Sequence, residues 1–403
     1  MFGRVFKAFS YRDFRLMWIG ACASSIGTWM QIVAQGWLIY RISHSAFLLG
    51  LDQFLGGIPI FLFSLIGGVV ADRVERRRIL LISQYVQMAS AATLTILVAT
   101  SLLGTHVWPI LCLSFVSGLA QAFGGPAYQA LIPTLVKKED MPNAIALNSI
   151  QFNLAVMVGP ALAGQALARL GEKWCFGLNA LSFLAPIISL SIITTRFLPQ
   201  KTTDSIFGSL KQGIQFVRKQ PSMEALIVLA FCMTSLSVPM RTYLPVFVKD
   251  IFNRGPETYG NLLALMGLGS ICGSLTVAGV GHIGKRGRVA LGALVCLGVA
   301  ILGFGLSRSL HFSGAMLVLS GASMMAAFAM VSSLVQLITT DDMRGRVMSV
   351  YNVAFRGGMP MGNLLSGWLV PVLTVPIVLG INGTLLIIVA LYFLVVQRKV
   401  AAL

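Results

Sequence analysis

Residues 67–78 read Gly-Gly-Val-Val-Ala-Asp-Arg-Val-Glu-Arg-Arg-Arg and lie between two long apolar runs. The two glycines at the end of the first run allow its backbone to approach a neighbouring helix closely. Asp72 is a hydrogen-bond acceptor at the predicted membrane edge, where it can lie at the positive end of another helix. The four arginines mark that edge as cytoplasmic, because membrane proteins concentrate Lys and Arg on that side. The stretch therefore predicts a short cytoplasmic turn between two membrane-spanning helices.

The composition of the whole chain predicts an all-α polytopic membrane protein. The 403 residues are 56% hydrophobic and only 11% charged, with a mean hydropathy of +0.84. A soluble protein carries about twice that share of charge. Runs of about 20 apolar residues, enough to cross a bilayer, recur from end to end. They predict twelve transmembrane helices, near 15–40, 46–71, 79–103, 108–135, 144–168, 174–195, 222–247, 258–281, 289–307, 313–339, 346–369 and 373–396.

These spans form two predicted halves of six helices each, residues 1–195 and 222–403. The polar stretch between them, 196–221, carries apolar residues at helical spacing. This spacing favours a cytoplasmic linker with an amphipathic helix on the membrane surface, and an ordinary solvated linker is the alternative.

The two halves also repeat short sequence features. Asp140-Met141 follows the fourth span and Asp342-Met343 follows the tenth, while Pro160 and Pro360 lie in the fifth and eleventh. Parallel repeats of this kind relate the halves of some transporters by a pseudo-two-fold axis. We therefore expect the two halves to share one fold.

The net charge of +17 reports membrane topology and does not indicate nucleic-acid binding. Most Lys and Arg fall in predicted cytoplasmic segments when both termini are placed inside, and some are expected to contact anionic lipid. The first span follows a basic segment directly and is too long for a cleavable signal peptide, so it is expected to remain as an anchor. The six cysteines lie in apolar spans without metal-ligand spacing, so no metal or other cofactor is expected.

Several stretches resemble the major facilitator superfamily. Gly-x-x-Ala-Asp-Arg-x-x-Arg-Arg, at 68–77, is similar to the signature loop between its second and third spans. Residues 12–16, 27–31, 159–164 and 342–351 are similar to the bacterial enterobactin-exporter and macrolide-efflux branch. The resemblance covers nearly the whole chain. It implies a proton-driven exporter of small molecules in a bacterial cytoplasmic (inner) membrane, without identifying the substrate.

Ionisable residues inside a membrane are costly, so each one is a candidate for function. Asp52 lies 20 residues before Asp72, and Arg241 lies 20 residues after Pro221, which puts both about 30 Å from the cytoplasmic edge. The resemblance implies that spans one, two, seven and eight close the outer gate. We therefore predict that an Asp52–Arg241 pair holds this gate shut and that protonation of Asp52 releases it. Arg41 is a competing partner, and a solvated helix-end carboxylate without coupling is the alternative.

At the cytoplasmic edge, Asp72 is expected to meet the start of the eleventh span. Exposed amide groups and the helix dipole there favour a carboxylate, and an arginine can add a charge-assisted bond. Such a contact would hold the inner gate closed. The residues assigned to this inner latch are Gly68, Asp72, Arg73, Arg76, Arg77, Arg344 and Arg346.

Polar stripes on the spans suggest which residues line a substrate cavity, although small polar residues also hold helices together without binding anything. The candidates are Thr28, Gln31, Gln35, Gln121, Ser237 and Arg356. Arg356 lies near the middle of the eleventh span. It either bonds to backbone carbonyls loosened by Gly357 and Gly358 or meets an anionic group of the substrate.

The fifth span contains Gly159, Pro160 and Gly164. Proline and closely spaced glycines kink or thin a membrane helix, and the resemblance associates this motif with exporters.

The sequence therefore predicts a secondary active exporter, a proton antiporter for a small amphipathic compound such as a siderophore or drug. Its partners are this substrate, protons and membrane lipid, and it is expected to work as a monomer without binding nucleic acid. A lysophospholipid or lipid flippase of the same fold is the first alternative. A non-transporting membrane receptor is less consistent with the short loops, and an enzyme is not expected because no Ser–His or metal cluster is present in the sequence.

Overall fold

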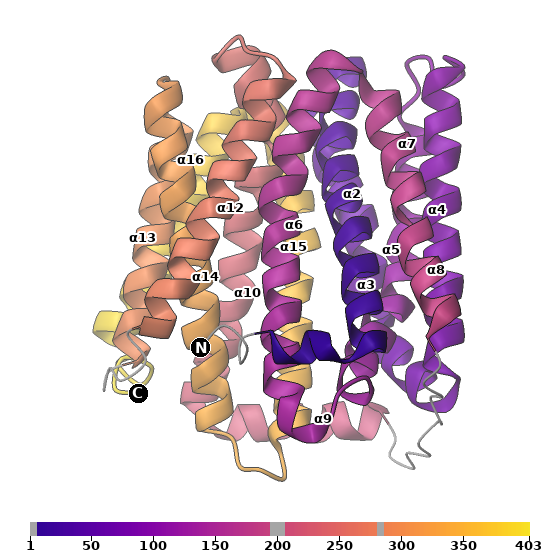
Figure 1. The fold of residues 1–403 in the computed structure, drawn as a ribbon. Coiled ribbons are helices and arrows are strands. Elements are labelled where there is room, and N and C mark those ends of the chain that lie inside the picture. Colours follow the sequence, from indigo (N-terminus) through magenta and orange to yellow (C-terminus); the bar gives the residue numbers. More distant parts are fainter. Residues whose placement is uncertain (1–5, 194–205, 280–285) are drawn as a thin grey trace. The chain divides into compact units, whose positions relative to one another are not determined.

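The computed structural model describes residues 6–193, 206–279 and 286–403, and its regular elements in these ranges are all helical (Figure 1). In chain order they are η1 (Lys7–Ser10), α2 (Arg12–Ser43), α3 (Ala46–Arg73), α4 (Arg76–Ala99), α5 (Trp108–Leu131), η2 (Ile132–Thr134), η3 (Lys138–Asp140), α6 (Met141–Arg169), α7 (Glu172–Ser182), α8 (Leu184–Ile192), α9 (Ile206–Lys219), α10 (Pro221–Thr242), α11 (Leu244–Val246), η4 (Phe247–Ile251), α12 (Pro256–Gly279), α13 (Arg286–Leu306), α14 (Leu310–Leu337), α15 (Arg344–Leu373), α16 (Val375–Leu391) and η5 (Tyr392–Val396).

Eleven helical runs in the described ranges are long and apolar enough to cross a membrane. They correspond to eleven of the twelve predicted spans. The remaining predicted span, 346–369, is the 30-residue helix α15, which is long enough to cross but is not among the eleven. Asn352, Arg356 and Asn363 interrupt the apolar sequence of this helix. The all-α membrane fold is therefore confirmed, while the count of apolar spans reaches eleven in the described part of the chain.

Four of the predicted spans are not single regular helices. The fourth ends in the 3-10 helix η2, and the twelfth continues from α16 into the π-helix η5. The sixth is divided at Phe183 into α7 and α8. The seventh continues from α10 through α11 into the π-helix η4, so the run extends over Pro221–Ile251.

The chain divides into two compact units. Unit 1 comprises Met1–Ser43 and Ile58–Thr203, and unit 2 comprises His44–Gly57 and Asp204–Leu403. The sequence places all of span two in the first half, whereas the structure groups the beginning of α3 with unit 2. Within unit 2, a Cβ atom on Gly50 would lie 2.5 Å from the Asn363 carbonyl oxygen. This close approach explains why the beginning of α3 packs with unit 2, and the division falls two residues before Pro59 in the same helix.

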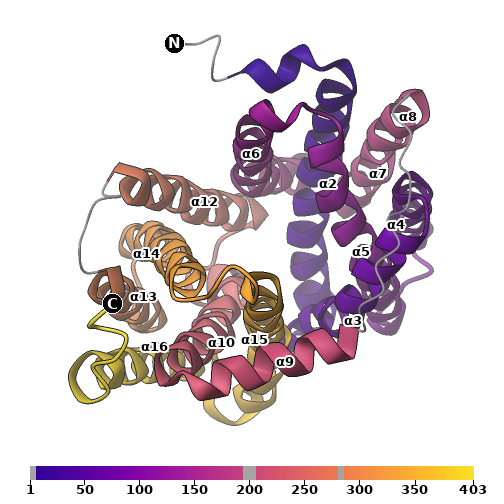
Figure 2. The same cartoon turned by 90° about the horizontal axis from the view of Figure 1, so that it is seen from below.

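Within unit 2, α9 crosses the beginning of α15, which is viewed nearly end-on in Figure 2. A Cβ atom on Gly213 would lie 2.7 Å from the carbonyl oxygen of Arg346, so only glycine allows this approach. Val217 is buried one turn further along, whereas Lys211 and Arg218 are exposed. The predicted linker thus contains a helix, and part of its apolar face contacts protein. The side chains of Ile206 and Phe207, two further apolar residues of the predicted helix, lie outside the described part.

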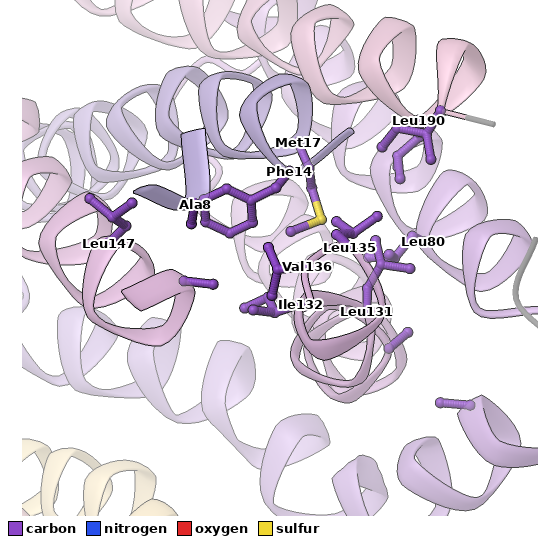
Figure 3. Close-up of a cluster of buried hydrophobic side chains, with 14 of the residues drawn as sticks. Ala8, Phe14, Met17, Leu80, Leu131, Ile132, Leu135, Val136, Leu147 and Leu190 are labelled. Atoms are coloured by element: carbon purple, nitrogen blue, oxygen red, sulfur yellow. The ribbon is translucent and has the colours of Figure 1, made fainter. Parts of the chain in front are cut away.

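One end of unit 1 is held by a cluster of buried apolar side chains, which we call the Phe14 cluster (Figure 3). Segments far apart in the sequence contribute residues to it, among them η1, α2, α4, α5, α6 and α8. Its members include Ala8, Phe14, Met17, Leu80, Leu131, Ile132, Leu135, Val136, Leu147 and Leu190. The cluster fixes the short loops at this end of unit 1 relative to the helices.

Candidate functional site

Asp52 is buried inside a membrane-spanning helix, in the part of α3 that belongs to unit 2. Its side chain is only 2% exposed, and Gln53 donates a hydrogen bond of 3.3 Å from Nε2 to its Oδ2. Arg241 lies in the last turn of α10, also in unit 2. A Cβ atom on Gly50 would lie 2.6 Å from the hydroxyl of Tyr243, so α3 and the end of α10 touch close to both charged residues. The hydroxyl of Tyr243 in turn donates to the Asn363 carbonyl at 2.9 Å.

Arg41, the competing gate residue, has a partner within unit 1. Its Nε lies 2.9 Å from Oε1 of Glu172, at the start of α7. The ion pair ties the end of α2 to the start of the sixth span. Glu172 was not singled out by the sequence, because an acidic residue in the first turn of a helix is common.

The arginines of the turn between α3 and α4 bind backbone carbonyls of unit 1. Arg76 donates to the carbonyl of Ala130 at 3.0 Å, and Arg77 donates to those of Ser191 and Ile193 at 2.8 and 3.1 Å. These carbonyls lie at the ends of α5 and α8, where a cation also interacts favourably with the helix dipole. The two arginines therefore fasten the turn to the ends of two neighbouring helices.

The other predicted latch residues of this turn are Gly68, Asp72 and Arg73. Arg73 is exposed, and the side chain of Asp72 lies outside the described part of the structure. A Cβ atom on Gly68 would have no neighbour within 4 Å, whereas one on Gly67 would overlap the carbonyl oxygen of Ala122. The close helix approach therefore depends on Gly67 rather than on Gly68.

At the start of α15, the other two latch candidates have local partners. Arg344 forms an ion pair with Asp341, three residues earlier. Arg346 donates to the sulfur of Met343 at 3.5 Å. Both contacts lie within the first turn of α15 or just before it.

Two glutamines assigned to the cavity form hydrogen bonds within unit 1. Asn179 of α7 donates to Oε1 of Gln31 at 2.7 Å, and Gln35 donates to the hydroxyl of Ser114 in α5 at 2.8 Å. These bonds hold α2 to α7 and to α5. In the same unit Thr28 is partly buried and Gln121 is exposed.

In unit 2, Ser237 is 2% exposed and donates weakly to the sulfur of Met324 at 3.8 Å. This contact joins α10 to α14.

The predicted kink in the fifth span lies in α6, which runs without interruption through Pro160. A Cβ atom on Gly159 would lie 2.5 Å from Cβ of Trp29, so this glycine lets α6 pack closely on α2. Gly164 is buried one turn further along.

Arg356 differs from the arginines above. Its side chain is exposed, and the structure records no hydrogen bond or ion pair for it in the described ranges. The predicted bonds to carbonyls near Gly357 and Gly358 are not among the recorded contacts. The nearby carbonyl of Phe355 accepts a hydrogen bond from Thr234 at 2.9 Å instead.

Unit 2 also contains a cavity of about 430 Å³ at one end of α14. Phe328, Ser332, Ser333, Gln336 and Arg344 are among the residues that line it. The ring of Phe328 lies 4.9 Å from the ring of Phe355, measured between centroids. The cavity thus lies between α14 and the start of α15, and one of its lining residues, Phe328, contacts Phe355.

The sequence did not single out a polar group beside the Phe14 cluster. Nζ of Lys7 lies 2.8 Å from Oδ1 of Asp140, and the hydroxyl of Tyr11 donates to Oδ2 of the same carboxylate at 2.8 Å. The hydrogen bond and the charge of Asp140 raise the pKa of Lys7 above its ordinary value. The repeated Asp-Met pair pointed to Asp140, but nothing in the sequence pointed to its partners.

Comparisons with known proteins agree with this architecture. A family model described as transmembrane secretion effector matches residues 4–402. The multidrug efflux pump Tap of Mycolicibacterium fortuitum is 25% identical over 87% of this chain and 88% of its own length. The enterobactin exporter EntS of Shigella boydii is also 25% identical, over 95% of this chain and 91% of its own length.

Among solved structures, a POT family transporter in complex with a thioalcohol-conjugated peptide has the same fold. The TM-score is 0.79 over 96% of both chains, at 12% sequence identity. The family and these relatives are membrane transporters rather than enzymes. With the helical membrane fold, the match over nearly its full length shows that this chain belongs to the transmembrane secretion effector family of the major facilitator superfamily.

Proposed function

We propose that this protein is a secondary exporter that exchanges protons for a small amphipathic compound, such as a siderophore or drug, by alternating access. It would work in a bacterial cytoplasmic membrane with both termini in the cytoplasm. The similarity to a drug efflux pump and a siderophore exporter supports the export of small molecules.

The observation that carries the proposal is the burial of Asp52. Within the described residues, the buried carboxylates are those of Asp52 and Asp140. Asp140 directly precedes α6 and forms an ion pair with Lys7. A carboxylate buried in a membrane helix is expensive unless it is paired or protonated, and this makes it a suitable proton carrier. Asp52 is therefore the candidate coupling residue.

Arg241 is the proposed partner of Asp52. Both belong to unit 2, and the contact between Gly50 and Tyr243 brings their helices together two residues away from each charge. Protonation of Asp52 would remove the attraction between the carboxylate and the guanidinium. The beginning of α3 could then separate from α10.

The experiment is proton flux in liposomes that contain the purified protein and a trapped pH dye. A panel of siderophores, drugs and lysolipids is added under an imposed pH gradient. We expect at least one compound to trigger proton movement in the parent and in Glu257→Gln, an exposed carboxylate in the first turn of α12. Asp52→Asn should lose this movement while the purified protein remains folded.

Two results would contradict the proposal. Substrate movement without proton flux would exclude antiport and favour a uniporter or a lipid flippase, depending on which compound moves. Proton-coupled transport that is unchanged in Asp52→Asn would exclude Asp52 as the coupling residue.

A further inference from the structure

Arg356 is a cation in the middle of a membrane-spanning helix, without a recorded partner among the described residues. It lies 12 residues after Arg344, the first residue of α15, which corresponds to about 18 Å along the helix axis. The guanidinium cannot lose its proton at any physiological pH, so it must find water or an anionic partner. No hydrogen bond or ion pair is recorded for it in the described ranges. A partner from outside the chain would satisfy it.

The orientation of Arg356 argues against contact with lipid. Leu365, Trp368 and Val372 are strongly exposed on α15 and form its apolar side, with Trp368 at 70% and Val372 at 80%. At 3.6 residues per turn, Arg356 lies about 120–180° around the helix from these three residues. Asn352, one turn before Arg356, is exposed on the same side. The exposed polar side of α15 is thus opposite its lipid-facing side.

Two aromatic side chains of α14 and α15 contact each other at the position just before this cation. Phe355 and Phe328 are both half-buried, and their ring centroids are 4.9 Å apart. Phe328 also lines the cavity of about 430 Å³, a volume in the range of small-molecule sites. Ser332, Ser333 and Gln336 supply polar groups along this cavity.

We propose that Arg356 anchors the substrate and that the transported compound is an amphipathic organic anion. Its carboxylate, or another anionic oxygen group, would bind the guanidinium, and its apolar body would lie on Phe328 and Phe355. Guanidinium suits this task because its fork of donors binds a carboxylate with two parallel hydrogen bonds. The inference rests on the proposed function, the export of a small molecule, and adds the charge of that molecule.

The test is direct binding to the purified protein in detergent by equilibrium dialysis. The probes are aromatic carboxylates, each paired with its uncharged methyl ester. The parent should bind at least one carboxylate more tightly than its ester. Arg356→Gln should weaken binding of that carboxylate by about 10- to 100-fold, the loss expected for a hydrogen bond between charged groups. Binding of the ester should stay within about threefold.

Two further variants make the result specific. Arg356→Lys keeps the charge but not the bidentate geometry, so it should bind the carboxylate with intermediate affinity. Arg308→Gln removes an exposed arginine just before α14 and should bind both probes as the parent does. The thermal unfolding of each variant in detergent serves as the check on folding.

The inference is overturned if the parent prefers no carboxylate, or if Arg356→Gln weakens the acid and the ester equally. Dialysis needs no proton gradient, so its result does not depend on coupling. Proteoliposomes that export neither member of a bound pair would contradict the proposed function and leave the anion site intact. Proteoliposomes that export both members equally well from the Arg356→Gln variant would contradict the inference and leave the proposed function intact.

Discussion

The Phe14 cluster of unit 1 and the helix α15 of unit 2 treat their polar groups differently. Around the cluster, Asp140 binds both Lys7 and Tyr11. Arg76 and Arg77, in the turn between α3 and α4, donate hydrogen bonds to backbone carbonyls at the ends of α5 and α8. On α15, Oδ1 of Asn363 is buried without a hydrogen-bond partner, and Arg356 has no recorded partner in the described ranges. The polar groups around the Phe14 cluster therefore stabilise unit 1. The polar groups of α15 that lack partners lower stability, and such groups in a native structure often have a role in binding or in a conformational change.

The largest effect on stability should come from removing the Phe14 side chain. Phe14 is 1% exposed at the centre of its cluster, so Phe14→Ala should lower the free energy of unfolding by about 3 kcal/mol. Ile82→Ala, on an exposed side of α4, should change it by much less. Thermal unfolding in detergent measures both. If the two variants unfold alike, the cluster does not stabilise unit 1 in the way that the comparison requires.

The next effect should separate two neighbouring glycines of α3. Gly67→Leu places a side chain against the Ala122 carbonyl and should destabilise the protein by about 1–3 kcal/mol. Gly68→Leu meets open space and should unfold like the parent. The same unfolding measurement decides this. Transport by Gly68→Leu adds a second readout, because a loss of transport without a loss of stability would support the predicted role of Gly68 in the latch.

A smaller effect of opposite sign is expected on α15. Asn363→Leu removes a buried amide whose oxygen has no partner, so it should raise the free energy of unfolding by about 1 kcal/mol. Asn382 is the matched control, because its Nδ2 donates to Ser366 at 3.1 Å in the same unit. Asn382→Leu should therefore lower stability by about 1 kcal/mol. Equal losses in the two variants would contradict the distinction between satisfied and unsatisfied groups.

Apolar periodicity was sufficient to predict most of the fold. A run of about 20 apolar residues predicts a membrane helix by itself, because the thickness of the bilayer sets its length and the lack of water there requires internal backbone hydrogen bonds. The exception is α15, where Arg356 and two asparagines lower the apolar character of a 30-residue helix. The runs of apolar residues still predicted this span at 346–369.

The site was less predictable because its contacts join distant parts of the chain. Gln31 was assigned to a cavity, yet it accepts a hydrogen bond from Asn179, which lies 148 residues away. The sequence around Gln31 does not indicate this partner. Arg76 and Arg77 bind backbone carbonyls, which every residue possesses and which leave no mark in the sequence. Arg356 could be singled out because a charge in a membrane helix is informative by itself.

The division of α3 between the two units has a mechanical consequence. The helix is continuous from Ala46 to Arg73, and its residues are divided between the two units after Gly57. Pro59 has no amide hydrogen and cannot donate to the carbonyl of Leu55. The helix α3 therefore lacks one backbone hydrogen bond close to the division between the units. Gly56 and Gly57 immediately precede this point and add backbone freedom. The section of α3 with the fewest backbone restraints thus coincides with the place where the chain passes from unit 2 to unit 1.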